Sequence, residues 1–155
     1  TLMRSSAASD VYKRQNESGA DNIGIVVIFR ADGAVKNPAI YHTESGEFTK
    51  VGYLDNDFIM SSGQYVIINT YTGKKNAYLL DGVTQAEIEN HKDNYGVIDW
   101  DTVIEKYGTV INEYLDEDGE FIQLQDGTNT LTYTADEGTN YLSVSVYYRI
   151  SYLGV

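Results

Sequence analysis

Alternation of apolar and polar residues predicts that most of the chain forms short β-strands separated by turns. Near the C-terminal end, alternate positions are apolar over nine residues: Leu142, Val144, Val146, Tyr148 and Ile150. The positions between them are mostly polar: Ser143, Ser145, Tyr147 and Arg149. This pattern is typical of a strand that has one face in the core and the other in water.

Residues 24–31 (GIVVIFRA) are apolar almost without interruption, which predicts a strand covered on both faces. Turn residues between further apolar runs predict three hairpins. The expected pairs are residues 39–43 with 47–51, residues 64–70 with 74–80, and residues 120–124 with 128–135. Together these segments predict an all-β protein, an antiparallel β-sandwich.

An inserted helical segment is expected around residues 84–115. Thr84 and Glu87 have the spacing of a capping box, and Asp99 or Asp101 can cap a second helix. One apolar stripe follows at three- and four-residue steps: Trp100, Val103, Ile104, Tyr107, Ile111, Tyr114 and Leu115. Gly108 opposes this helix by about 1 kcal/mol.

Composition narrows the class of protein. The 155 residues suit one domain, and the absence of Cys excludes disulfide scaffolds, zinc ribbons and thiol catalysis. The net charge of −12 argues against binding to nucleic acid or to anionic lipid. No apolar run approaches the roughly 20 residues that span a bilayer, so we expect a soluble protein without membrane insertion.

The first fifteen residues are predicted not to belong to the fold. Residues 5–15 (SSAASDVYKRQ) resemble the translation of a sequencing-library adapter, which would make the chain a metagenomic fragment whose own N-terminus is missing. The alternative is a native arm, although it lacks the apolar segment of a signal peptide. We expect residues 1–15 to be a non-native, disordered tail and residues 16–155 to form a single β-sandwich domain.

Motifs for chemistry are nearly absent. His42 and His91 have no metal-site spacing and are interpreted as surface histidines. There is no G-x-S-x-G motif and no phosphate-binding glycine motif before Gly73. We therefore predict no catalytic, metal or cofactor-binding residues, and leave glycan-binding residues undefined.

Acidic and aromatic residues leave alternatives open. Carboxylates come in close groups: Asp55/Asp57, Asp99/Asp101 and Asp116/Glu117/Asp118. The last group is interpreted as a solvated acidic turn, because it lacks the ligand spacing of a calcium loop. Seven tyrosines suit either the edges of the core or a binding surface, with packing favoured: Tyr41, Tyr53, Tyr65, Tyr71, Tyr78, Tyr147 and Tyr152.

Several blocks of the chain resemble siphophage distal tail proteins, the hub components of the tail tip. The matching blocks are residues 37–41 (NPAIY), 45–48 (SGEF), 69–75 (NTYTGKK), 115–116 (LD), 121–124 (FIQL), 127–129 (GTN), 133–136 (YTAD), 147–148 (YY) and 152–155 (YLGV). They keep one register from about Gly24 to Val155. The chain departs from the family pattern at residues 62–65 and in residues 83–112, which are longer than usual.

The resemblance implies the C-terminal domain of such a protein, a galectin-like or carbohydrate-module-like jelly roll. In the family, an N-terminal domain, missing here, builds a hexameric ring, and the sandwich projects toward neighbouring proteins. The implied partners are the tail tube, a tail-associated hub or receptor-binding protein, and other copies through the missing domain.

The function implied is that of a non-enzymatic phage virion structural protein. It would be a distal tail or baseplate hub component for tail-tip assembly and host attachment, made in the host cytoplasm without a signal peptide and located at the virion tail tip. The alternative is a carbohydrate-binding module that adheres to host cell-surface glycans. A concave sheet face lined by exposed Tyr or by Trp100 would favour that alternative. A weaker third possibility is an accessory domain of a glycoside hydrolase.

Overall fold

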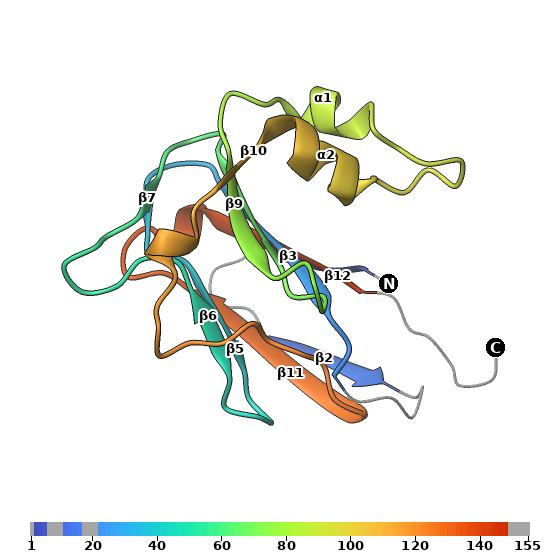
Figure 1. Ribbon diagram of the computed structural model, residues 1–155. Helices are drawn as coiled ribbons and strands as arrows, with labels where there is room; N and C mark the ends of the chain where they lie inside the picture. Colours follow the sequence, from blue (N-terminus) through green and yellow to red (C-terminus); the bar gives the residue numbers. More distant parts are fainter. Residues whose placement is uncertain (1, 6–10, 17–21, 149–155) are drawn as a thin grey trace.

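Two antiparallel β-sheets pack face to face, and a helical layer covers the outer face of one of them (Figure 1). The computed structural model describes residues 2–5, 11–16 and 22–148. Sheet A has the strand order β1-β12-β3-β8-β9-β10, and sheet B has the order β2-β11-β5-β6. The predicted antiparallel β-sandwich with a helical segment is therefore confirmed.

The strands of sheet A are β1 (Leu2–Ser5), β3 (Ile25–Ala31), β8 (Tyr65–Asn69), β9 (Asn76–Leu80), β10 (Gly108–Val110) and β12 (Leu142–Tyr148). Those of sheet B are β2 (Val11–Asn16), β5 (Ala39–His42), β6 (Phe48–Lys50) and β11 (Gly127–Thr134). A two-stranded sheet joins β4 (Val35–Lys36) and β7 (Ile59–Met60). The α-helices are α1 (Gln85–Glu89) and α2 (Trp100–Tyr107), and short 3-10 helices span Asn112–Tyr114 and Thr139–Tyr141.

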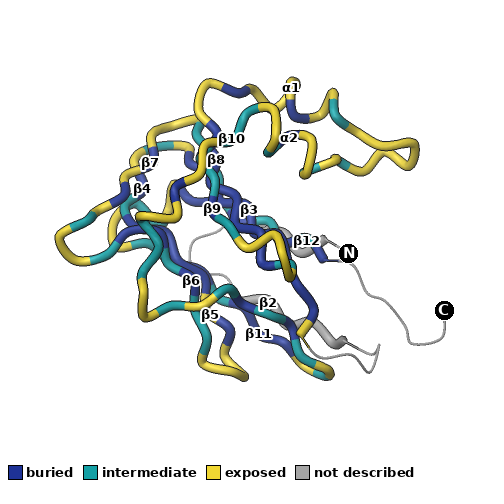
Figure 2. Tube along the Cα trace, viewed as in Figure 1, coloured by how far each residue is buried: buried dark blue, intermediate teal, exposed yellow. Residues whose placement is uncertain are grey.

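The main core lies between the inner faces of the two sheets, where the buried segments of Figure 2 run side by side. Val144 and Val146 of β12 are buried there, so the predicted register of this strand is confirmed. Strand β3 is buried on both faces, as its uninterrupted apolar run predicts. Val27 packs into the core between the sheets, and Ile28 packs under the helical layer.

Two of the three predicted hairpins are confirmed, β5–β6 and β8–β9. The third is wrong, because β11 pairs with β2 and β5 and not with residues 120–124. Ile122 and Leu124 are instead buried in the core between the sheets. Glu120 donates its backbone N–H to the Phe48 carbonyl at 2.7 Å, so this segment covers the free edge of β6.

The helical segment divides into two short helices. Helix α1 has the predicted capping box, and α2 begins after Asp99, whose Oδ1 accepts the Thr102 backbone N–H at 3.2 Å. The expected continuation to Leu115 is wrong, because the backbone is extended over β10 (Gly108–Val110) and then forms only a short 3-10 helix at Asn112–Tyr114. Ile111 packs between the sheets, whereas Val103 packs on the outer face of sheet A. The residues of the predicted apolar stripe are therefore divided between the core that separates the two sheets and the apolar cluster under the helices.

The helical layer is held against sheet A by a second apolar cluster. Val103 of α2 and Ile88 of α1 are buried against outer-face residues of β3 and β8 such as Ile28 and Ile67. Burying side chains of this size contributes about 1.5–3 kcal/mol each. No helix among the residues described is long and apolar enough to cross a membrane.

Residues 2–5 and 11–16 form the edge strands β1 and β2, which pair with β12 and β11. This pairing differs from the expected disordered tail without packed contacts. The physical reason is that a sheet edge offers unpaired backbone groups, with which an extended segment of almost any sequence can pair. Residues 1, 6–10, 17–21 and 149–155 lie outside the described residues. The adapter origin and the domain boundary at residue 16 stay predictions.

Candidate ligand-binding cleft

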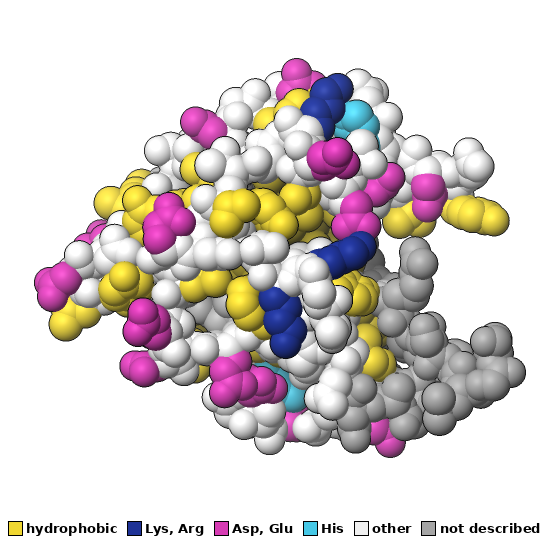
Figure 3. Space-filling view, in the orientation of Figure 1, with side chains coloured by type: hydrophobic (Ala, Val, Ile, Leu, Met, Phe, Trp, Pro, Cys, Tyr) yellow, Lys and Arg dark blue, Asp and Glu magenta, His cyan; other side chains and the backbone are white. Residues whose placement is uncertain are grey.

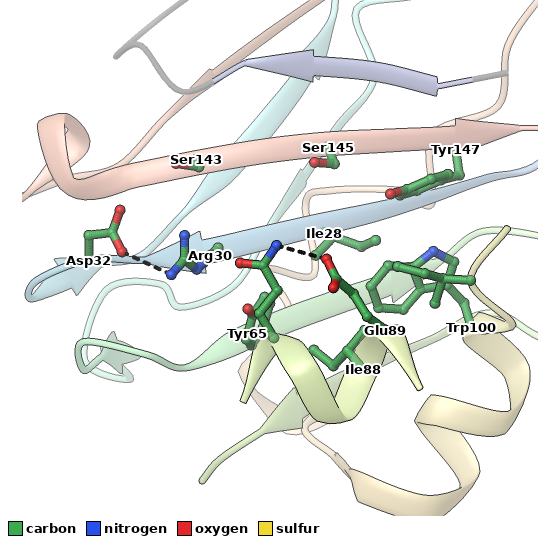
Figure 4. Close-up of a pocket in the computed structure, with 12 residues that line it drawn as sticks. Ile28, Arg30, Asp32, Tyr65, Ile88, Glu89, Trp100, Ser143, Ser145 and Tyr147 are labelled. Carbon is green, nitrogen blue, oxygen red and sulfur yellow. Dashed lines mark hydrogen bonds and ion pairs between the residues drawn. The ribbon is translucent and has the colours of Figure 1, made fainter. Parts of the chain in front are cut away.

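A cleft of about 260 Å³ lies between the outer face of sheet A and the helical layer (Figure 4). Strands β3, β8 and β12 supply its floor, while α1, Ile98 and Trp100 supply its wall. Each of the three floor strands is paired with a neighbour on both sides. The floor therefore presents side chains, and its backbone groups are used within the sheet.

One end of the cleft is aromatic. Trp100, the only tryptophan of the chain, begins α2, and its ring lies beside that of Tyr147 on β12. The two ring centroids are 5.6 Å apart and the ring planes are inclined by 53°. Both side chains are half-buried, so each ring is held by packing and still borders the cleft.

Charged and polar groups occupy the rest of the cleft. The Arg30 guanidinium lies 3.5 Å from the Asp32 carboxylate and 6.0 Å from the centre of the Tyr65 ring. On the helical side, Gln85 Nε2 donates a hydrogen bond of 3.2 Å to Glu89 Oε1. These groups could bind both donors and acceptors of a ligand, because carboxylates accept hydrogen bonds and guanidinium groups donate them.

Two of the residues that line this cleft carry an unusual buried nitrogen. Among the residues that the structure describes, Arg30 Nε and Trp100 Nε1 are the buried side-chain polar atoms without a hydrogen-bond partner. Leaving a buried donor unpaired costs about 1–3 kcal/mol. The two nitrogens are themselves buried, but their residues line the same cleft, which makes this cleft a candidate ligand site.

The predicted tyrosines mostly pack at the edges of the core, as expected. Tyr65 is buried, and Tyr53, Tyr71, Tyr78 and Tyr147 are half-buried. Tyr41 is 37% exposed on β5, where its ring stacks on Phe48 with the centroids 5.6 Å apart. Tyr152 lies outside the described residues. Of these tyrosines, Tyr65 and Tyr147 border the cleft.

The interpretation of His42 as a surface residue is wrong, because it is only 1% exposed. Its Nε2 lies 2.8 Å from Asn129 Oδ1, and its Nδ1 lies 2.6 Å from Ser45 Oγ. Nearby, Glu44 accepts hydrogen bonds from the backbone N–H and hydroxyl of Thr130. Burial raises the pKa of Glu44, but these hydrogen bonds and the nearby His42 lower it more, so it lies below its ordinary value. This network joins the β5–β6 turn to β11.

His91 is half-buried, and its ring meets that of Tyr107 edge-on at a centroid distance of 5.9 Å. The acidic groups have separate roles. Asp99 caps α2, Asp101 pairs with Lys74 at 3.1 Å, and Asp116 accepts the Asp118 backbone N–H within a turn. Within the described part of the chain, no three His, Asp or Glu side chains come together as a metal site would require.

Asp57 belongs to a second polar network, centred on the buried Asn37. Asn37 Nδ2 donates to Asp57 at 2.9 Å and to Asp136 at 2.8 Å, while its Oδ1 accepts the Phe58 backbone N–H at 2.8 Å. The hydrogen bonds from Asn37 are the main reason that the pKa values of both carboxyls lie below their ordinary range. Lys36 and Lys50 pair with the same two carboxylates.

Sequence reasoning named the aromatic residues of the cleft but missed its charged ones. Arg30 lies near the end of β3, whose apolar run indicates core packing, and Asp32 directly follows this strand. Glu89 lies in a helix of five residues. The polar face of β12 was expected in water, yet Ser143 and Ser145 are half-buried beside the cleft. Arg149 lies outside the described residues. The sequence feature that could have indicated the cleft is a polar strand face together with an inserted amphipathic helix that can lie over it.

Comparison of the chain with protein-family models, with curated proteins and with solved structures finds no match. The likeness to galectin-like domains and to distal tail proteins therefore stays a prediction from the sequence blocks.

Proposed function

We propose that this domain is a non-enzymatic structural component of a phage tail tip, where the sandwich presents its faces and loops to neighbouring tail proteins. The proposal begins from the sequence blocks that resemble distal tail proteins. One observation supports reading those blocks as a single signature: blocks far apart in the chain bond to one another across the fold.

Two hydrogen bonds join separate blocks, and a third joins a block to the residue next to another block. Asn37 of the NPAIY block bonds to Asp136 of the YTAD block. Gln123 Nε2 of the FIQL block donates to the Thr70 carbonyl of the NTYTGKK block at 2.5 Å. Phe48 of the SGEF block accepts the Glu120 backbone N–H beside the FIQL block. Residues of separate blocks are therefore partners in this fold, as a shared family signature would require.

The genes around the intact reading frame test this proposal. Tail-tip genes are expected beside it, with a tape-measure gene upstream. A neighbourhood of carbohydrate-metabolism or secretion genes, without tail genes, would contradict a structural role in a virion.

A second candidate function, adhesion to host glycans, is favoured by the cleft. An aromatic pair beside carboxylate, amide, hydroxyl and guanidinium groups suits the alternating apolar and polar surfaces of a sugar. Labelled protein applied to a glycan array tests this function. Saturable binding to a defined set of glycans is expected, and an array without signal above a heat-denatured sample would contradict it.

A further inference from the structure

The inserted segment makes the cleft. Residues 84–107 supply Gln85, Ile88, Glu89, Ile98 and Trp100 to its wall. The remaining lining residues lie on strands of sheet A, except Asp32, which directly follows β3. Without this segment, the outer face of sheet A would be an open surface. The segment is also the part of the chain that is longer than usual for the family that the sequence resembles.

We infer that this cleft is a binding site for a short, uncharged saccharide. The inference rests on the second candidate function and names its site and ligand class. At one end, Trp100 and Tyr147 offer ring faces against which the C–H groups of a sugar can pack (Figure 4). At the other, Arg30 and Asp32 can donate to and accept from sugar hydroxyls.

The charge of the cleft decides against an anionic ligand. Its lining holds one basic group, Arg30, and two acidic groups, Asp32 and Glu89. Arg30 is already opposed by Asp32, and acidic side chains are also spread widely over the face of the molecule shown in Figure 3. The whole chain carries a net charge of −12, which repels anions over a longer range. A uronic acid or a phosphate would therefore be disfavoured relative to a neutral sugar.

The strand pairing decides against an extended peptide. Peptides commonly bind to sheets by adding a strand to a free edge, where backbone groups are unpaired. The floor of this cleft is the face of β3, β8 and β12 and not a free sheet edge, and β3 and β8 are paired on both sides by strands outside residues 1–15. Recognition here depends on side chains and ring faces. The volume of about 260 Å³ is also slightly below the range of about 300–1,000 Å³ typical of ligand pockets, which favours a short ligand.

Trp100 is the natural reporter, because the only tryptophan of the chain borders the site. The full chain would be titrated with lactose, maltose and N,N′-diacetylchitobiose as neutral probes, and with glucuronic acid as an anionic probe. We expect a saturable change in tryptophan emission for at least one neutral probe, with a Kd on the order of 1 mM or below, and a weaker response to the acid.

Tyr147→Ala removes half of the aromatic end and is expected to weaken this binding about tenfold. Tyr41→Ala is the matched control. It removes a ring from a similar aromatic pair on β5, in the other sheet, and should leave the affinity unchanged. Thermal unfolding of both variants checks that they are folded. If Tyr147→Ala is too unstable to measure, Tyr147→Phe takes its place. This variant keeps the ring and should retain most of the affinity.

The possible results distinguish an error in the proposed site from an error in the proposed glycan-binding function. Array binding that survives Tyr147→Ala would keep glycan adhesion and overturn the cleft as its site. Preference for glucuronic acid would overturn the uncharged ligand class. No response to any saccharide, together with an empty array, would overturn both the site and the second candidate function.

Discussion

Removing the side chain of Asn37 should destabilise the sandwich more than its size suggests. Asn37 is 2% exposed and has a φ of 52°, a left-handed conformation that Asn tolerates better than most residues. Asn37→Gly keeps this backbone conformation accessible and removes the three hydrogen bonds of the side chain. It therefore isolates the contribution of the polar network from that of backbone strain.

The magnitude follows from the three partners. The backbone N–H of Phe58 would be left buried without its acceptor, which costs about 1–3 kcal/mol. The bonds to Asp57 and Asp136 involve partly exposed carboxylates and add less than buried charged bonds would. Greater freedom of Gly in the unfolded chain adds about 0.4–1 kcal/mol. We expect a total loss of about 2–4 kcal/mol.

Urea unfolding monitored by Trp100 fluorescence measures this loss, and Tm should fall by about 5–15 °C. Asn56→Ala is the matched control, because Asn56 donates one hydrogen bond of 3.1 Å to the Glu113 carbonyl near the surface. It should cost less than about 1 kcal/mol. Equal losses of stability for Asn37→Gly and Asn56→Ala would contradict a special contribution of the Asn37 hydrogen bonds to the stability of the sandwich.

Three further predictions concern the core, the edge strands and pH. Val146→Asp should prevent folding, because it buries an unpaired carboxylate, whereas Ser145→Asp on the other face should change Tm by only a few degrees; similar effects, measured by circular dichroism, would contradict the register. Deleting residues 1–15 should lower Tm by several degrees through loss of the pairing to β11 and β12, and a change within about one degree would mean that this pairing contributes nothing. The pKa values of Glu44 and Asp136 are lowered in the folded state, so the stability that these carboxylates contribute is present above their unfolded pKa values and is lost as pH falls through the folded ones. The free energy of unfolding should therefore decrease below about pH 4, and it should decrease less steeply in Asn37→Gly. A pH dependence that this substitution leaves unchanged would contradict the role of the Asn37 network.

Local patterns predicted the sheets well because strand faces and caps depend on neighbours in sequence. The alternation in β12, the uninterrupted run in β3 and the capping box at Thr84 each follow from residues a few positions apart. Residues 120–124 were predicted incorrectly for the same reason. Their apolar positions look like a strand, and only the three-dimensional packing shows that they fill the end of the core.

The cleft could not be predicted because its parts come from distant segments. Trp100 and Tyr147 are both visible as candidates in the sequence, yet their contact depends on how the inserted segment lies on sheet A. The burial of His42 likewise depends on Asn129, a partner 87 residues away. Periodicity says which side of a strand faces outward, and it does not say what covers that side.

Immunogold electron microscopy tests whether the protein lies at the phage tail tip, as proposed. Antibodies raised against the purified domain would be applied to virions from a culture that carries the intact gene. Gold particles are expected at the distal end of the tail. Virions that are labelled on the capsid, or tails that remain unlabelled while the antibodies still recognise the denatured protein in the same preparation, would contradict it.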